Sequence, residues 1–138
     1  MRNLLAAVVA IAALGGPVQA TDSSGFVIQL GETWLFQLDQ GRPINARKVD
    51  ANAKPAVGEL FVTLRPQLGT TMVIANNSAK FYNYRALMMR RPGDRAEATS
   101  VCTVMSNGRM GFENWPYPIA AIHLSDFTEA PENSMVCR

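Results

Sequence analysis

The stretch LFVTLRPQLGTTMVIA, residues 60–75, decides the fold class of this protein. Leu60, Val62 and Leu64 stand at every second position, which is the period of a β-strand with one buried face. The turn residues Gln67-Leu68-Gly69 follow, and the run after them is rich in the β-branched residues that strands favour. The sequence therefore predicts two strands joined by a turn.

Further short strands are predicted on both sides of this pair. Before it, runs with β-branched and aromatic content indicate strands at 26–30 and 34–38, and the polar stretch from there to Gly58 holds one short strand at most. After it, extended runs are expected at 99–105, 110–113 and 119–124, with a loop over 129–133. Asn107-Gly108 favours a type I′ hairpin turn because both central residues take positive φ, so residues 110–113 are expected to fold back on 99–105.

Residues 81–89 fit two descriptions. Ala86-Leu87-Met88-Met89 are good helix formers, whereas Tyr82, Tyr84, Ala86 and Met88 fall on one face at period two. We interpret the segment as a strand. This gives about eight or nine short strands at spacings near 8–12 residues and no long helix, which is typical of a sandwich or barrel. We expect one all-β domain over residues 21–138, an immunoglobulin-like β-sandwich of about eight strands.

Residues 1–20 have the pattern of a cleaved signal peptide. One positive charge at Arg2 precedes the apolar run Leu4–Leu14, and Val18-Gln19-Ala20 ends in a small residue suited to cleavage. The run is shorter than the roughly 20 apolar residues needed to cross a bilayer. We expect an exported protein, periplasmic in a bacterium or secreted, with no transmembrane segment in the mature chain; a retained N-terminal anchor is the alternative.

Both cysteines lie in the mature part of the chain. In an oxidising compartment Cys102 and Cys137 are expected to form one disulfide that ties down the C-terminus. A redox-catalytic pair is the alternative, but 34 residues separate the two cysteines, unlike the C-x-x-C spacing that lowers a thiol pKa.

Composition argues against several partners and cofactors. Without residues 1–20 the formal net charge is +1, so no nucleic-acid partner is predicted. The only histidine, His123, lacks a triad motif and is expected on an exposed strand face. Zinc needs three or four ligands, which one histidine and two oxidised cysteines do not supply, so no metal or other cofactor is predicted. Copper held by methionines and His123 stays open as an alternative.

Two surface features are candidate contacts. Four arginines, Arg85, Arg90, Arg91 and Arg95, surround the Pro92-Gly93-Asp94 turn, where guanidinium groups could grip oxyanions or simply be solvated. The loop Trp115-Pro116-Tyr117-Pro118 holds two amphipathic aromatic rings of the kind that binding hot spots use. Trp115 is expected either in such a contact or as a plug at the open end of the sandwich.

No constellation in the sequence specifies a reaction. We therefore expect an exported non-enzymatic binding or accessory domain that acts through its surface loops on a protein or an envelope component. Two other classes stay open. One is periplasmic copper handling. The other is a small secreted hydrolase with carboxylate catalysis. Its candidate acids are Glu32, Asp39, Asp50, Glu59, Glu97 and Glu113, and nothing in their spacing brings two of them together.

Overall fold

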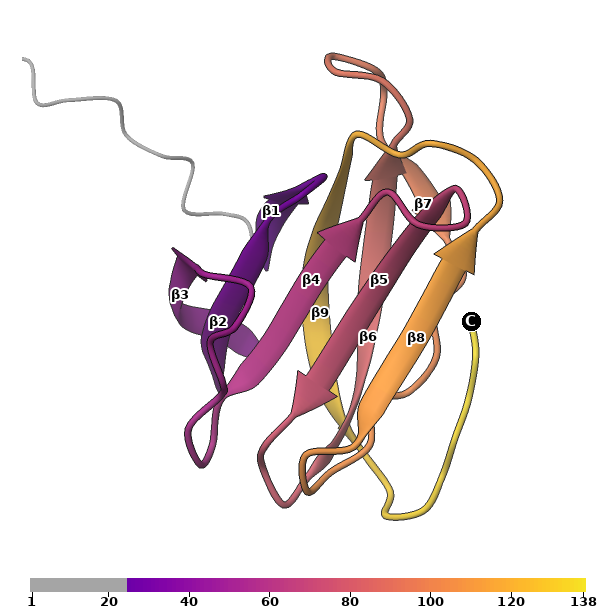
Figure 1. Cartoon of the computed structure of the whole chain (residues 1–138). Coiled ribbons are helices and arrows are strands. Elements are labelled where there is room, and N and C mark those ends of the chain that lie inside the picture. Colours follow the sequence, from indigo (N-terminus) through magenta and orange to yellow (C-terminus); the bar gives the residue numbers. More distant parts are fainter. Residues whose placement is uncertain (1–24) are drawn as a thin grey trace, which may run out of the picture.

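The computed structural model describes residues 25–138, and these form nine strands in two antiparallel sheets that face each other as a β-sandwich (Figure 1). The predicted signal peptide at 1–20 lies outside the described residues. Within 25–138 there is no helix long and apolar enough to cross a membrane. The all-β prediction is confirmed.

One sheet has four strands and the other has five. In spatial order the four-stranded sheet consists of β1 (Gly25–Gln29), β9 (Ala121–Ala130), β6 (Phe81–Met89) and β7 (Glu97–Thr99). The five-stranded sheet consists of β3 (Arg42–Val49), β2 (Thr33–Asp39), β4 (Leu60–Arg65), β5 (Thr70–Asn76) and β8 (Met110–Trp115).

The core lies between the two sheets. As the period-two pattern predicts, Leu60, Val62 and Leu64 of β4 point inward and are at most 1% exposed. Ile122 and Leu124 of β9 reach the same core from the other sheet and are fully buried. Aromatic rings also pack within and across the layers, among them those of Phe26, Phe36, Tyr84 and Phe127.

The strands predicted at 26–30, 34–38 and 110–113 are confirmed as β1, β2 and β8, and those of the central pair and of 81–89 are confirmed as well. The 60–65 and 70–75 segments pair as antiparallel β4 and β5, with Leu60 opposite Asn76. Residues 81–89 form β6, a strand and not a helix, because its backbone pairs with β9 along most of its length and with β7 at residues 86–88.

The hairpin expected around Asn107-Gly108 is wrong. Both residues have positive φ, 60° and 74°, as a type I′ turn needs, but the following strand β8 pairs with β5 and not with 99–105. The regular strand β7 ends at Thr99. The backbone after it is already engaged, since Val104 bridges to Tyr82 and Cys102 bridges to Cys137. The chain therefore crosses to the other sheet at this turn.

Two strands are longer than predicted. The polar stretch after β2 contains β3, an eight-residue strand at the sheet edge, where a half-exposed position tolerates polar side chains on both faces. β9 starts at Ala121 and continues to Ala130, beyond the predicted end at 124 and into the predicted loop. A register shift opposite Asn83 and Arg85 and the positive φ of Asp126 mark a bulge that interrupts the alternation.

The predicted disulfide joins Cys102 to Cys137, 35 positions apart. The C-terminal residues also form backbone hydrogen bonds to the segment around Cys102, because Val101 and Arg138 exchange N–H···O bonds of 2.8 and 2.9 Å. The disulfide thus covalently locks a short stretch of antiparallel pairing that holds the C-terminus on the sandwich.

Candidate functional site

The two surface features predicted from the sequence meet at one end of the sandwich. Arg90 directly follows β6, and Tyr117 lies in the connection between β8 and β9. The guanidinium carbon of Arg90 is 3.8 Å from the centroid of the Tyr117 ring, a cation–π contact. The two connections are held together because the Ala120 N–H donates to the Met89 carbonyl oxygen over 2.9 Å.

The turn between β4 and β5 packs against the loop of residues 115–118 and holds it in place. The Thr70 hydroxyl, fully buried, donates to the carbonyl oxygen of Tyr117 at 3.0 Å and accepts the Ile119 N–H at 2.9 Å. Gly69 has φ +89°, and a Cβ there would lie 2.5 Å from the Tyr117 nitrogen. A side chain at this position would collide with the loop backbone. The glycine therefore allows the loop to pack directly on the turn, which fixes the position of Tyr117.

The two aromatic residues of the loop have different environments. Trp115 ends β8 with its side chain in the core, 6% exposed, and its Nε1 donates to Thr99 Oγ1 at 2.8 Å. The Trp115 side chain is therefore part of the hydrophobic core. Tyr117 is half-buried, and its hydroxyl contacts the Met88 sulfur at 3.7 Å. Of the two rings, that of Tyr117 contacts an arginine, Arg90.

The four arginines do not all lie together. Arg90 and Arg91, with Asp94 and Pro118, line an open cleft of about 510 Å³. Arg95 is exposed in the same β6–β7 connection but is not among the cleft residues. Arg85 lies five residues back along β6, which corresponds to about 16 Å of strand. Across residues 25–138, none of the four is in an ion pair with a carboxylate.

This arrangement can bind an oxyanion. Stacking on Tyr117 covers one face of the Arg90 guanidinium but leaves its N–H edge available for two parallel hydrogen bonds to a carboxylate or phosphate. Arg91 in the same cleft adds a second positive charge, while the negative charge of Asp94 lowers the net charge of the cleft to about +1. We expect selectivity for a single anionic group over a polyanion.

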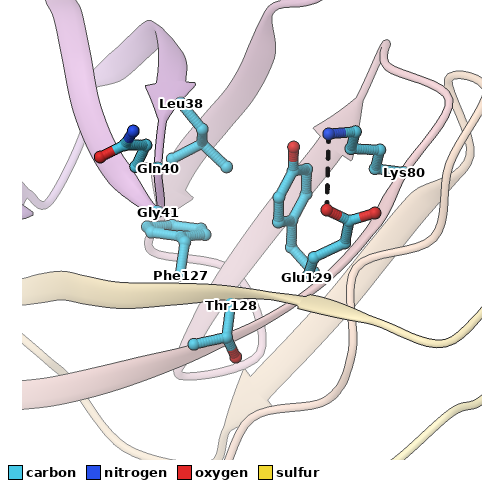
Figure 2. A pocket seen from close by; sticks show the side chains of 8 residues that line it. Leu38, Gln40, Gly41, Lys80, Phe127, Thr128 and Glu129 are labelled. Carbon is cyan, nitrogen blue, oxygen red and sulfur yellow. Dashed lines mark ion pairs between the residues drawn. The ribbon is translucent and has the colours of Figure 1, made fainter.

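A second cleft, of about 320 Å³, was not predicted (Figure 2). Figure 2 shows Gln40 and Leu38 of the β2–β3 hairpin facing Lys80 and Glu129, which form an ion pair of 3.4 Å. Phe127 forms its floor but is only 2% exposed. The two charges of this cleft pair with each other, so the cleft offers an ionic ligand less than the Arg90 cleft does. No local sequence signal marks it, because its residues come from three distant segments.

Three of the six carboxylates considered for a hydrolase accept a hydrogen bond from another part of the fold. Glu59 accepts from Arg47 Nη1 at 2.9 Å, and Glu32 accepts from Trp34 Nε1 at 2.9 Å. Glu113 accepts the Cys102 N–H at 2.7 Å. These three stabilise turns and the disulfide segment.

The copper alternative requires methionines close to His123. Met72 and Met88 are buried in the core, whereas Met110 and Met135 are more than half exposed. His123 is half-buried on the outer face of the four-stranded sheet, level with Val27 and Leu87. In the described part of the chain no three His, Cys, Asp or Glu side chains are grouped as metal ligands.

Comparison with known proteins identifies no relative. The chain matches no protein-family model, no curated protein and no solved structure. Its function is therefore inferred from the groups that its surface presents.

Proposed function

We propose that this protein is an exported, non-enzymatic binding domain that holds an oxyanion of its partner, a protein or a component of the cell envelope, against Arg90 and Tyr117. The observation that carries the proposal is the 3.8 Å stacking of the Arg90 guanidinium on the Tyr117 ring. A guanidinium held in one orientation loses less side-chain entropy on binding than a free one, and its fork geometry fits carboxylate and phosphate.

The support for binding over catalysis lies in the construction of this end of the sandwich. Thr70 and Gly69 fix the loop that carries Tyr117, and Arg90 follows the last residue of β6. A loop held in place by buried groups keeps its contact residue in one position, which suits recognition. We also propose an immunoglobulin-like grouping for the sandwich, supported by its division into antiparallel sheets of four and five strands, and an export signal at residues 1–20.

The experiment compares defined anionic probes in NMR titrations of the protein without residues 1–20. The probes are vesicles of phosphatidylglycerol, vesicles of phosphatidylcholine, a glutamate-rich decapeptide and a short DNA duplex. We expect the Arg90 side-chain N–H resonances to shift with the peptide or the anionic vesicles, which separates a carboxylate source from a phosphate source, and binding to weaken with salt.

Matched variants tie the binding to the cleft. Arg90→Gln and Tyr117→Ala should each weaken the bound probe by about tenfold or more, as expected for loss of a charged hydrogen bond or its support. Arg42→Gln, which removes an exposed arginine on β3, is the control and should have no effect. Equal binding by Arg90→Gln and the parent protein, or binding of no anionic probe, would overturn the proposal.

A further inference from the structure

Strand β8 forms one edge of the five-stranded sheet (Figure 1). Its inner neighbour is β5, with Thr70 opposite Trp115 and Ala75 opposite Met110. On its other side no strand within residues 25–138 pairs with it. An edge of this kind presents unpaired backbone groups unless something covers it.

The register shows which backbone groups of β8 point outward. The Gly108 N–H donates to the Asn76 carbonyl at 2.8 Å, so the main-chain groups of Asn76 face β8. Because such groups alternate along an antiparallel strand, Ile74 also faces β8 and pairs with Gly111. The N–H and C=O groups that face away from the sheet are then those of the alternate residues Met110, Phe112 and Asn114.

Two of these residues, Met110 and Phe112, carry exposed apolar side chains on the outer face of the sheet. Phe112 is 67% exposed and Met110 is 58% exposed, although both lie in a regular strand. Beside Met110 lies a cleft of about 380 Å³ that Phe61, Ala75 and the segment 53–55 also line. Unpaired backbone and one exposed ring thus belong to the same strand, and the apolar cleft begins at Met110 on the β5 side of that strand. Together they fit the addition of a β-strand, in which main-chain bonds give affinity and side-chain pockets give specificity.

Positive charge lies at the border of this surface. Lys54 lines the cleft, and Arg109 directly precedes β8. Neither is in an ion pair with a carboxylate in the described part of the chain. Arg109 donates instead to the Ser106 carbonyl oxygen at 3.3 Å. A ligand seated here would satisfy these charges with a carboxylate.

We propose that β8 binds an extended segment of a partner protein as a sixth strand of the sheet, with apolar side chains at alternate positions and an acidic residue near Lys54 or Arg109. β8 has six residues, which corresponds to about 20 Å and to a bound segment of similar length. This surface is separate from the Arg90 cleft, and the inference does not depend on the function proposed there.

The observations favour a peptide over a lipid surface or a second copy of this chain. Lipid tails offer no hydrogen-bond partners for the outward groups of Met110, Phe112 and Asn114. In a β8-to-β8 dimer the outer face of the added strand would carry the same three residues and no carboxylate. Lys54 and Arg109 would then stay without an opposite charge, as they are in the single chain.

The experiment selects ligands from a library of random twelve-residue peptides displayed on phage, using the immobilised folded domain, and then measures synthetic versions of the selected peptides. We expect the selected sequences to alternate apolar and polar residues and to contain Asp or Glu. In the complex, amide hydrogen exchange should slow at Met110, Phe112 and Asn114.

Variants distinguish the edge from other apolar surface. Phe112→Ser removes the ring, and Phe112→Pro also removes the outward N–H, a change that edge strands tolerate. Both should weaken the peptide by about tenfold or more, as expected for loss of a buried contact. Leu68→Ser, which changes a residue that is 86% exposed on the β4–β5 turn, should have no effect.

A charge reversal keeps the test valid if Phe112→Pro fails to fold. Lys54→Glu combined with Arg109→Glu should weaken the selected acidic peptides and strengthen versions with Lys in place of Asp or Glu. The proposal is overturned if no sequence is enriched, or if the charge reversal and Phe112→Ser leave binding unchanged. Protection of β8 in the free protein with a concentration-dependent dimer would also overturn it, in favour of a second copy.

Discussion

The Thr70 hydroxyl donates a hydrogen bond to the carbonyl oxygen of Tyr117, 3.0 Å away, from a position with no exposed surface. The Thr70 Oγ1 atom also accepts the Ile119 N–H at 2.9 Å. One buried side chain on β5 therefore satisfies two backbone groups of the loop that carries the proposed contact residue. Thr70 is not among the residues that line the Arg90 cleft, and it acts by positioning Tyr117.

Thr70→Val should therefore loosen the aromatic loop. The substitution keeps the shape but removes both bonds, and the unsatisfied Ile119 N–H should cost about 1–3 kcal/mol of unfolding free energy. Urea denaturation measures the loss, and weaker NOEs between Arg90 and the Tyr117 ring report the displaced loop. Thr71→Val is the control, since its hydroxyl also makes two hydrogen bonds but with exposed groups, the Gln67 carbonyl and Asn114 Nδ2. Equal effects of the two variants would contradict a positioning role.

Trp115→Ala and Tyr117→Ala should separate stability from binding. Loss of the buried indole of Trp115 should cost about 3–5 kcal/mol, the range for a large aromatic removed from a core. Tyr117→Ala removes a half-buried ring and should change the melting temperature far less while weakening the anionic probe. Thermal unfolding followed by circular dichroism measures the first effect. A Trp115→Ala protein as stable as the parent would show that the core closes without the indole.

The strand pattern was predictable where a single local signal decides it. Leu60, Val62 and Leu64 alternate with polar or half-buried positions, so β4 follows from its period alone. The partner of β8 was not predictable from Asn107-Gly108, because a turn fixes the reversal of the chain but not the sheet that the next strand joins. That choice depends on Val104 and Cys102, whose bridges to Tyr82 and Cys137 occupy the nearer position.

The candidate site was predictable in its parts and not in its assembly. Arginines beside a turn and a Pro-flanked Tyr117 are visible in the sequence. Their stacking is not, since the Ala120–Met89 hydrogen bond that brings the two connections together joins segments far apart in the sequence. The edge position of β8 was not predictable either, because it depends on the order of the strands in the sheet, which the local sequence around Phe112 does not show.

Removing the disulfide should lower stability without changing the sandwich. Replacing Cys102 and Cys137 by Ser releases a constraint across 35 positions, which corresponds to about 3–4 kcal/mol in the chain-entropy treatment. Urea denaturation of the oxidised parent and the double variant measures the difference. Titration of the non-reduced parent should find no free thiol. Two reactive thiols would contradict the bond, and a covalent dimer would redirect it to a second chain.

Glu59→Gln should destabilise the protein at neutral pH and much less in acid. The hydrogen bond from Arg47, together with the Ala56 N–H, holds the pKa of the Glu59 carboxyl below its ordinary value. The carboxylate therefore stabilises the fold above about pH 4.5, and this contribution disappears as the pH falls through the lowered pKa. We expect a loss of about 1 kcal/mol at pH 7, since half of the Arg47 side chain is exposed.

Urea denaturation at several pH values checks the behaviour of Glu59. Glu132→Gln, at an exposed position after β9, is the control and should leave the curve unchanged. An equal loss of unfolding free energy in Glu59→Gln at pH 3 and pH 7 would contradict this role of the carboxylate. It would show that the glutamine amide packs poorly and that the charge of Glu59 does not stabilise the fold.

Glu113→Gln should have the opposite effect. Burial on the inner side of β8 raises the pKa of the Glu113 carboxyl, although the bond from the Cys102 N–H acts against this. The folded protein then binds the proton more tightly than the unfolded chain does, so stability is lost as the pH rises from about 4.5 through the raised pKa. Glutamine keeps an oxygen for the Cys102 N–H and carries no charge. The variant should therefore melt above the parent at pH 7 and match it near pH 4. A lower melting temperature for the variant at pH 7 would show that the charged bond to Cys102 outweighs the cost of burying the carboxylate.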